Sequence, residues 1–452
     1  MNETRDCQNC KTDFTIEPDD FSYYEKMGVQ TPLLCTECRS QLRLSFRNER
    51  AFYKRPCDKC KKDVISMYSP VRAGSPNKAH TVWCYDCWFS DDWEGTDYAK
   101  EYDDSRPFLE QFEELWNDIP KIGLIYVKSP GCEYTNISAD NKNCYLIIES
   151  SNNEDSIHSY WIQECRDVID TSFASKCERT YECDDCYDCY KVYYSKGSHE
   201  CRESYFLLDC KDCTNCIGCV NLRSKKFCIF NEQFSKEDYE EKLQELKLNT
   251  RGGVEKMRSM FDVFSKIQPR KYAEIVNATG STGDYIKHAK NCVSCFHCYE
   301  AEDNKYAVHV WRNAKDCMDV DTAGRNAVRI YNSINSGLDT FHQIVCAVCW
   351  GSTFSSYSMY AMNCNNIFGC AGLRKKDYCI LNKQYTKEEY ERITNEIIVK
   401  MKQEGIYGEF FPATFSCFGY NETAAPERFP LTKDEAIAQG FKWEDTPRGT
   451  FG

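Results

Sequence analysis

A stretch of 23 residues occurs twice in the chain, and this duplication constrains the fold more than any other feature. The first copy, GCVNLRSKKFCIFNEQFSKEDYE, spans residues 218–240, and the second, GCAGLRKKDYCILNKQYTKEEYE, spans residues 369–391. Thirteen of the 23 aligned positions are identical, which indicates an internal repeat. Each copy contains the S/T-x-x-D/E spacing of a capping box, so we expect a helix to begin there. We interpret the stretch as the closing turn of a structural unit that is used twice.

The chain around these copies predicts a repetitive β structure. From about residue 129, short segments of Cys, Tyr, Ile and Val alternate with Asn, Asp, Ser and Gly, and cysteines recur at steps of 21, 21 and 24 between Cys144 and Cys210. Coils of about 20–25 residues made of short strands and polar turns are typical of a parallel β-helix or a similar solenoid. The sequence therefore predicts two stacks, 129–234 and 274–385, each with a capped helix covering an open end.

The predicted fold class is mixed and mainly β, with two N-terminal zinc ribbons followed by two β-helix-like (parallel β-solenoid) repeats and their capping helices. The predicted domains are a first four-cysteine zinc ribbon with a basic helix (1–55), a second four-cysteine zinc ribbon and helix (56–128), a Cys-rich β-solenoid repeat with its capping helix (129–250), a linker helix with a second such repeat and its capping helix (251–404), and an aromatic C-terminal tail (405–452).

The chain has 31 cysteines, and their number bears on the cellular compartment. The N-terminus, MNETRDCQNC, has no apolar segment of the kind that a secretory signal requires. Without such a signal, repeated Cys-x-x-Cys spacing favours metal ligands and buried thiols in a reducing cytoplasm over disulfides. No run of about 18 apolar residues is present, which argues against a membrane span. We therefore expect a cytoplasmic protein without a membrane partner.

Four Cys-x-x-Cys pairs in the first 90 residues predict two zinc ribbons. In each ribbon the second pair follows the first after 24 or 23 intervening residues. Four thiolates complete the tetrahedral shell of Zn²⁺ and leave no position for a substrate water, so two structural zinc ions are expected. A redox or iron–sulfur role is the alternative. The predicted ligands are Cys7, Cys10, Cys35 and Cys38 in the first ribbon, and Cys57, Cys60, Cys84 and Cys87 in the second.

A basic segment connects the two ribbons. Residues 1–90 contain 14 Lys/Arg against 12 Asp/Glu, or +2, whereas the whole chain has a net charge of −13. Five cations recur every three to four residues and would form one stripe on a helix. Arginine suits phosphate because its guanidinium donates two parallel hydrogen bonds. The alternative is a solvated helix face that pairs with the chain's own carboxylates. The predicted nucleic-acid contacts are Arg39, Arg43, Arg47, Arg50, Lys54 and Arg55.

The cysteines of the repeats have three possible roles. Cys210, Cys213, Cys216 and Cys219 form a CxxCxxCxxC run that resembles a ferredoxin motif, although the last gap has two residues instead of three and no Pro follows. The second copy keeps only the equivalents of Cys213 and Cys219. A ladder of buried thiols is therefore favoured, with an additional zinc or an iron–sulfur cluster as alternatives.

Catalytic motifs are weak in this sequence. Asp167, Asp170, Asp319 and Asp321 are candidates for a carbohydrate-active β-helix, but Asp in turns more often caps backbone amides. No Ser/His/Asp arrangement and no phosphate-binding glycine loop is evident, since the Gly252–Gly253 pair is followed by VEKM. We expect no enzymatic activity and no small-molecule cofactor.

Several segments together resemble a family of bacterial proteins. They are the first ribbon FTIEPDDFSYYEKMGVQTPLLCTECRSQLR, the second ribbon WCYDCWFSDDWEGTDYAKEYDDSRPFLEQF, the repeated LNKQYTKEEY and the tail FPLTKDEAIAQGFKW. The similar proteins carry tandem four-cysteine zinc ribbons and a duplicated Cys-rich repeat region, and they have no established activity. The resemblance therefore implies an architecture and not a reaction.

The function expected from the sequence is that of a non-enzymatic zinc protein. Its ribbons would dock on nucleic acid, structured RNA or a ribonucleoprotein such as the ribosome, through the basic stripe. A second hypothesis is a structural scaffold whose acidic solenoid binds a protein partner. A third is a β-helix that binds or modifies carbohydrate.

Overall fold

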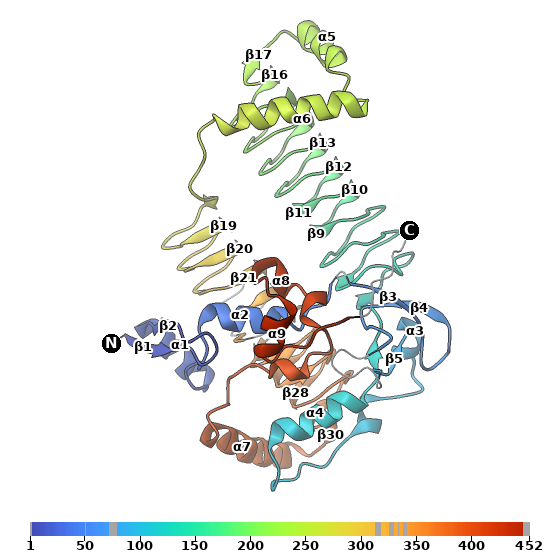
Figure 1. Cartoon of the computed structure of the whole chain (residues 1–452), viewed down its shortest axis with the longest axis vertical. Helices are drawn as coiled ribbons and strands as arrows, with labels where there is room; N and C mark the ends of the chain where they lie inside the picture. The colour runs from blue at the N-terminus through green and yellow to red at the C-terminus, as the bar shows by residue number, and fades with distance from the viewer. Residues whose placement is uncertain are drawn as a thin grey trace. The chain divides into compact units, whose positions relative to one another are not determined.

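The computed structural model describes residues 2–49, 51–71, 79–311, 318–324, 330–332, 334–337 and 341–445. The chain forms two compact units, one of Met1–Gly123 with Tyr272–Gly452 and the other of Leu124–Lys271 (Figure 1). Both units contain parallel sheets, so the mainly β class is confirmed, whereas the five-part domain division stays a prediction. The helices are α1 (Pro18–Met27), α2 (Thr36–Leu44), α3 (Tyr85–Trp88), α4 (Phe108–Asp118), α5 (Lys236–Leu246), α6 (Arg251–Lys266), α7 (Lys387–Gln403), α8 (Ala425–Arg428) and α9 (Lys433–Ala438).

The unit Leu124–Lys271 is built around stacked parallel strands, which we call the first ladder. Arg166 pairs with Glu178, which lies 12 residues further along the chain, and Tyr190 pairs with Arg202 at the same separation. The longer coil predicted from the cysteine spacing is therefore wrong, because each coil of the ladder is only about half as long. The strands are β7 (Tyr126–Val127), β8 (Ser138–Ala139), β9 (Tyr160–Gln163), β10 (Arg166–Ile169), β11 (Ser172–Ser175), β12 (Glu178–Tyr181), β13 (Tyr190–Tyr193), β14 (Arg202–Tyr205), β15 (Thr214–Ile217), β16 (Lys226–Ile229) and β17 (Glu232–Gln233).

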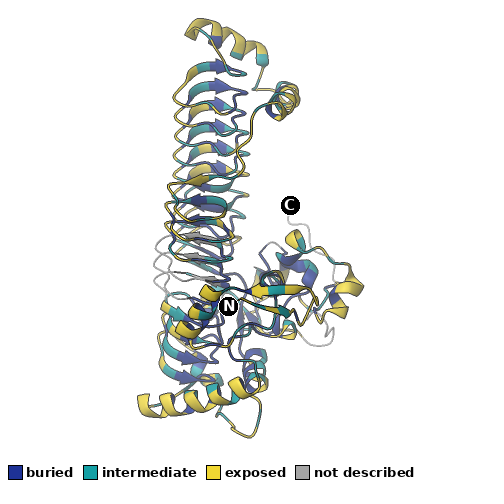
Figure 2. Ribbon diagram, turned by 90° about the vertical axis from the view of Figure 1, so that its left-hand side faces the viewer, coloured by how far each residue is buried: buried dark blue, intermediate teal, exposed yellow. Residues whose placement is uncertain are grey.

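A triplet of residues is the unit of this ladder, and four triplets make one step. In most triplets the first residue is buried, the second faces outward, and the third has a positive φ that turns the chain; the last inward positions, Leu222 and Lys225, are partly buried and exposed. The cysteine steps of 21 and 24 are multiples of three, which explains why they suggested a longer coil. Figure 2 shows buried residues recurring from strand to strand. Successive inward residues include Ile147, Ser150, Asn153, Ser156, Ser159, Ile162, Cys165 and Val168, and the turning residues include Leu146, Glu149, Asn152, Asp155, His158, Trp161, Glu164 and Asp167.

Inward side chains of different types make the same kind of hydrogen bond, to a carbonyl one strand further along the ladder. Asn153 Nδ2 donates to the carbonyl of Ile162, nine residues later, at 2.9 Å. Cys165 Sγ makes the same contact with the carbonyl of Ala174, at 3.8 Å. A thiol is a small, largely apolar group that is also a weak hydrogen-bond donor. It can therefore fill the core and at the same time donate to the carbonyl nine residues later. The CxxCxxCxxC run from Cys210 occupies four successive inward positions in one core cluster, as the interpretation as a thiol ladder predicts.

The second ladder lies in the other unit and contains a local change of step. Thr353 pairs with Asn365, which again lies 12 residues further along the chain. Most strand pairs of this ladder have the same separation. Val308 pairs with Asp321, Asp321 with Ile334, and Ile334 with Ala347, so three successive steps are one residue longer. Its strands are β18 (Ile275–Val276), β19 (Gly283–Lys287), β20 (Cys295–Tyr299), β21 (Val308–Trp311), β22 (Asp321–Gly324), β23 (Ile334–Ser336), β24 (Phe341–Gln343), β25 (Cys346–Ala347), β26 (Thr353–Ser356), β27 (Ser358–Met359), β28 (Asn365–Phe368), β29 (Asp377–Ile380) and β30 (Lys383–Gln384).

The duplicated stretch closes both ladders in the same way. The Asn382 side chain accepts a hydrogen bond from the N–H of Ala371 at 2.9 Å and donates one to its carbonyl at 2.8 Å, as an added strand would. Asn231 makes the equivalent pair with Val220. Helices α5 and α7 begin directly after, with Ser235 and Thr386 as N-caps, so both predicted helix starts are confirmed; the reciprocal capping box is formed by Thr386 with Glu389.

We expect Asn382→Ala to destabilise its unit more than Asn231→Ala destabilises the other. Asn382 is fully buried and also donates to the carbonyl of Gly95 at 2.8 Å, whereas Asn231 is partly exposed. Loss of the buried amide leaves backbone groups unsatisfied, at a cost of about 2–3 kcal/mol, against about 1 kcal/mol for Asn231. Denaturant unfolding followed by hydrogen exchange of each unit measures the two effects. Equal losses in the two variants would contradict the proposed difference in burial.

Candidate metal centres

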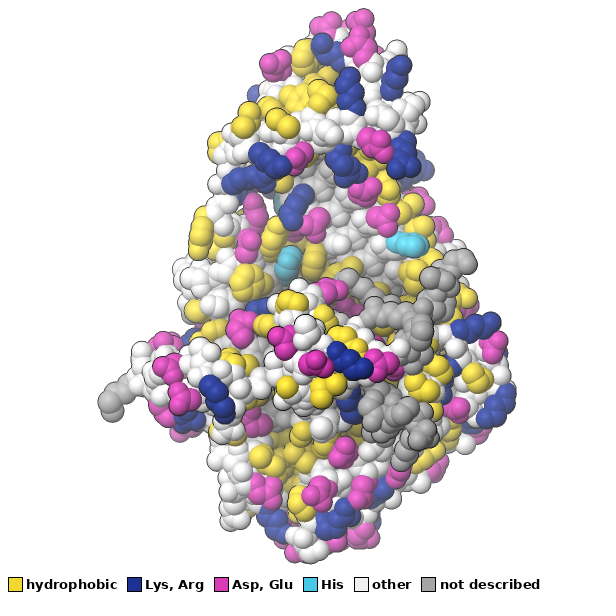
Figure 3. Space-filling model, in the orientation of Figure 1, with side chains coloured by type: hydrophobic (Ala, Val, Ile, Leu, Met, Phe, Trp, Pro, Cys, Tyr) yellow, Lys and Arg dark blue, Asp and Glu magenta, His cyan; other side chains and the backbone are white. Residues whose placement is uncertain are grey.

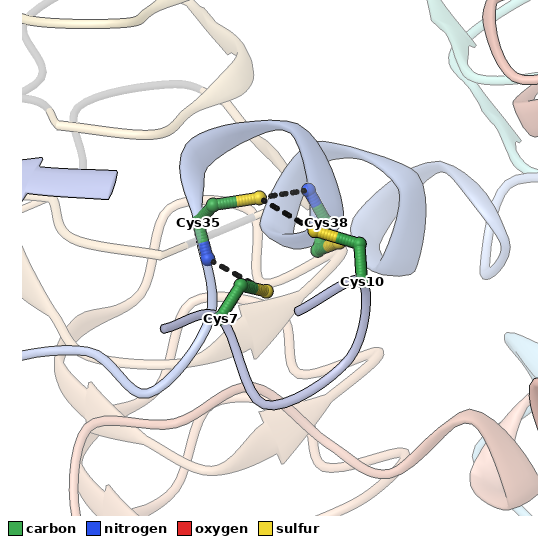
Figure 4. Close-up of side chains that lie close together, drawn as sticks. All are labelled: Cys7, Cys10, Cys35 and Cys38. Atoms are coloured by element: carbon green, nitrogen blue, oxygen red, sulfur yellow. Dashed lines mark hydrogen bonds between the residues drawn. The ribbon is translucent and has the colours of Figure 1, made fainter. Parts of the chain in front are cut away.

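The first candidate metal centre lies between a hairpin and a helix. Cys7 and Cys10 belong to the turn between β1 (Glu3–Asp6) and β2 (Asp13–Ile16), and Cys35 and Cys38 belong to the start of α2. Lys11, with a φ of 61°, lets the hairpin turn back so that both of its sulfurs face the helix. The four Sγ atoms lie within 4.8 Å of one another (Figure 4). Four thiolates at this spacing can hold one metal ion.

The second centre repeats this construction. Cys57 and Cys60 lie in the turn between β3 (Tyr53–Pro56) and β4 (Asp63–Ser66), where Lys61 has a φ of 63°. Cys84 and Cys87 lie at the start of α3, beside β5 (Val82–Trp83), which pairs with β6 (Lys121–Ile122). These sulfurs also lie within 4.8 Å of one another. Among the described residues, these two centres are the groups of ligand atoms close enough to hold a metal, and the Cys210–Cys219 run is not one of them.

Hydrogen bonds prepare the thiols for metal binding, because a metal ligates the thiolate form. The Thr12 hydroxyl, together with its backbone, lowers the pKa of Cys10 to about 6. Burial acts to raise the pKa of Cys57, but the backbone N–H groups around it outweigh burial and lower that pKa to about 7. Burial raises the pKa of Cys38. Each centre therefore combines thiols that ionise readily with thiols that need the metal's charge in order to ionise.

The two centres differ in how their sulfurs are supported. Both have a backbone donor, from the N–H of Cys35 to Cys7 Sγ at 3.3 Å and from the N–H of Cys84 to Cys57 Sγ at 3.2 Å. In the first, Asn9 Nδ2 also donates to Cys38 Sγ at 3.4 Å. In the second, Lys59 takes the place of Asn9 in the turn and pairs instead with Asp92 at 2.6 Å. Cys84 and Cys87 are also more exposed than Cys35 and Cys38. Donors to a ligand sulfur strengthen metal binding, so the first centre has the better support.

The arginines next to the first centre are buried. Arg39 Nε lies 2.6 Å from Asp319 Oδ2, and Arg43 Nε lies 3.0 Å from Asp321 Oδ2. Arg43 also donates to Asn332 Oδ1 at 2.9 Å. Both arginines are at most 3% exposed, and both aspartates are at most 2% exposed. We call the two arginines and two aspartates the arginine–aspartate cluster; it joins α2 to the second ladder where the ladder step widens by one residue.

The predicted solvent-facing cationic stripe is therefore wrong for these arginines. Arg47 is buried as well and contacts Glu49 and the Thr322 hydroxyl. Arg55 is buried and donates to Asp58 and to two backbone carbonyls. Lys54 is exposed, at 68% of its side chain, beside Asp63, and Arg50 lies outside the described residues. The alternative was a solvated face that pairs with the chain's own carboxylates; Arg39 and Arg43 do pair with carboxylates, but their face is buried and not solvated.

The second centre is attached to the duplicated stretch. Arg374 donates to the carbonyls of Ser90 and Trp93, at 3.0 and 2.9 Å, and its guanidinium lies 5.2 Å from the Trp93 ring centroid. The α4 residue Phe108 lies against Gly369, where a Cβ would come within 2.4 Å of the ring. The sequence offered no signal for these partners, because Arg374 and Trp93 are 281 residues apart along the chain.

We expect two metal ions per chain and release at two rates. A chromogenic chelator should remove the ion of the second centre first, because its sulfurs are more exposed and lack the Asn9 donor. Cys60→Ser should abolish the fast phase and Cys10→Ser the slow one. Asn9→Ala should accelerate only the slow phase, by about tenfold. A single phase, or acceleration of the fast phase by Asn9→Ala, would contradict the assigned difference.

We expect Arg43→Ala to destabilise the protein by about 3–5 kcal/mol, because it leaves Asp321 buried without its cation. Lys54→Ala, on the same basic segment, should change the stability by less than about 0.5 kcal/mol, because its ion pair is exposed. Denaturant titration of the metal-loaded protein, monitored by tryptophan fluorescence, compares the two variants. A similar effect of both substitutions would be inconsistent with the burial of the cluster.

Comparison with known proteins adds no further assignment. No protein-family model matches the chain, and no curated protein is similar to it. Within the described part of the chain, no helix has the length and apolar character needed to cross a membrane.

Proposed function

We propose that the protein is a non-enzymatic, zinc-dependent scaffold that binds a protein partner. The arginine–aspartate cluster carries this proposal. It joins the arginines suited to phosphate, Arg39 and Arg43, to the carboxylates suited to carbohydrate chemistry, Asp319 and Asp321. Each set neutralises the other in a buried contact, so neither faces a ligand. What the molecule offers outward is the surface of its ladders.

Zinc fits both metal centres. Four cysteine sulfurs suit the tetrahedral, sulfur-rich coordination that Zn²⁺ adopts in structural sites, and no position remains for a reacting water. The hairpin–helix arrangement of each centre is that of a zinc ribbon. In the first centre, Cys35 is the N-cap of α2 and Cys38 lies in its first turn, so a bound ion would fix the helix that carries Arg39 and Arg43. The metal would thereby support the attachment of the ribbon to the second ladder.

Parallel pairing at a regular short step supports the interpretation of both ladders as β-solenoids with short coils. Solenoids bind partners through extended surfaces because each repeat adds the same outward positions to a continuous face. The acidic net charge, −13 for the chain, favours a basic partner.

Docking on RNA or on the ribosome is the competing hypothesis. Of its six predicted contacts, Arg39, Arg43, Arg47 and Arg55 are buried, and Lys54 is exposed beside a carboxylate. Carbohydrate binding has a similar difficulty, because Asp319 and Asp321 are buried, although Asp167 and Asp170 are exposed. A cytoplasmic location is part of the proposal because the centres and the ladder cores require reduced thiols.

The proposal predicts that the metal-loaded protein does not bind nucleic acid in a salt-dependent manner. Fluorescence anisotropy with labelled RNA and DNA, at low and physiological salt, should show no more than weak binding, which Arg43→Ala leaves unchanged. Protein complexes recovered from cells should survive nuclease treatment and cross-link to ladder residues. Specific RNA binding that falls steeply with salt, or complexes that dissolve with nuclease, would favour the ribonucleoprotein hypothesis instead.

A further inference from the structure

One outward column of the first ladder is apolar over its whole length. It consists of cross-strand neighbours on successive steps of the ladder, each the second residue of its triplet. Such a column forms a continuous stripe, because every member lies directly beside the next strand's member. We call it the apolar column; it consists of Tyr145, Ile157, Ile169, Tyr181, Tyr193, Tyr205, Ile217 and Ile229.

Helices of the same unit cover the last part of the column. Tyr205, Ile217 and Ile229 belong to one core cluster with side chains of α5 and α6. The α6 residue Met257 is buried against Gly218, and the ring centroid of Phe261 lies 5.8 Å from that of Phe206. Figure 1 shows α6 running across the ladder strands beyond β13. Helices of its own unit therefore cover the end of the column, and α6 packs against the turn residues beside it.

A cation on the covering helix completes this contact. Arg258 of α6 lies 5.0 Å from the ring centroid of Tyr194 and pairs with Glu182 at 2.7 Å. Arg258 thus contacts an aromatic and an acidic residue that occupy successive turn positions beside the apolar column. Figure 3 shows hydrophobic side chains among charged ones over the part of the molecule where Figure 1 labels α6.

The rest of the column has the same chemistry and is partly exposed. Ile169 is 38% exposed, and Tyr145, Ile157, Tyr181 and Tyr193 are intermediate. Acidic residues stand at turn positions beside Ile157 and Ile169: Asp155 and Asp167 precede these column residues, Asp170 follows Ile169, and all three are exposed. Further along, Arg179 and Lys191 take the turn positions before Tyr181 and Tyr193, and Arg179 lies 3.9 Å from Asp167.

We propose that the exposed stretch of the apolar column, from Tyr145 to Tyr193, binds a basic amphipathic α-helix of a protein partner. The partner helix lies next to the part of the column that α5 and α6 cover: its apolar stripe lies on Ile157, Ile169 and Tyr181, and its Lys or Arg side chains pair with the aspartates beside Ile157 and Ile169. This inference rests on the proposed scaffold function and names the working face and the partner's chemistry.

The test uses full-length, metal-loaded protein and a fluorescein-labelled Leu/Lys peptide with helical amphipathic spacing. The peptide should bind, whereas a scrambled Leu/Lys peptide and a Leu/Glu peptide of the same spacing should not. Ile157→Thr/Ile169→Thr should weaken binding by at least about tenfold, because both contacts lose their apolar surface. Phe296→Thr is the matched control, since Phe296 is 41% exposed on the second ladder. Asp155→Lys/Asp167→Lys/Asp170→Lys should reverse the preference toward the Leu/Glu peptide.

Equal binding of the scrambled peptide, or binding that the Ile157→Thr/Ile169→Thr variant retains, would overturn the inference. Unchanged metal content and unfolding midpoint of each variant exclude misfolding as the cause of lost binding. A nuclease-resistant protein complex whose cross-links avoid the first ladder would also overturn it, while the scaffold function itself would stand.

Discussion

The backbone of both ladders turns at every third residue through a left-handed conformation, and the rest of the structure depends on this constraint. Residues other than glycine resist that conformation by about 1–2 kcal/mol each. Here it is adopted by Asn, Asp, Glu and Lys, and also by large residues such as Trp161 and Phe206. The hydrogen bonds between adjacent strands and the inward side chains must hold these turns in place. The core therefore accepts only side chains that are small enough for a narrow interior and still contact the carbonyls at the turns.

Buried charge performs a second structural task in the other unit. An ion pair removed from water is stable only when its remaining donors and acceptors are also occupied. Asn332 and the Leu34 carbonyl accept further hydrogen bonds from Arg43 and Arg39. The cluster lies where the ladder step widens, at β22, which α2 contacts. The basic segment, whose sequence predicts phosphate binding, thus attaches the first candidate metal centre to the second ladder.

The sequence predicted local features well and long-range partners poorly. The two metal centres, the caps at Ser235 and Thr386 and the repetition were all visible, because each depends on spacing within a few tens of residues. The length of the repeat was missed because a period of three resembles neither strand nor helix periodicity, and alternate residues do not share a face. The burial of Arg39 was missed because its partner Asp319 lies 280 residues away, and the same holds for Arg43 and Asp321.

The same Cys-x-x-Cys spacing also serves two purposes: in the hairpin turns it brings sulfurs together, and in the ladders it marks successive inward positions.

The triplet organisation determines which changes in chain length the ladders tolerate. Deletion of four consecutive triplets would remove one complete step and leave every column aligned with its neighbours. Deletion of a single triplet would keep buried residues buried. It would, however, move every following outward residue into the neighbouring column of the ladder. A shorter deletion would exchange inward for outward positions along the remaining ladder. Natural length variation among such chains is therefore expected in whole steps.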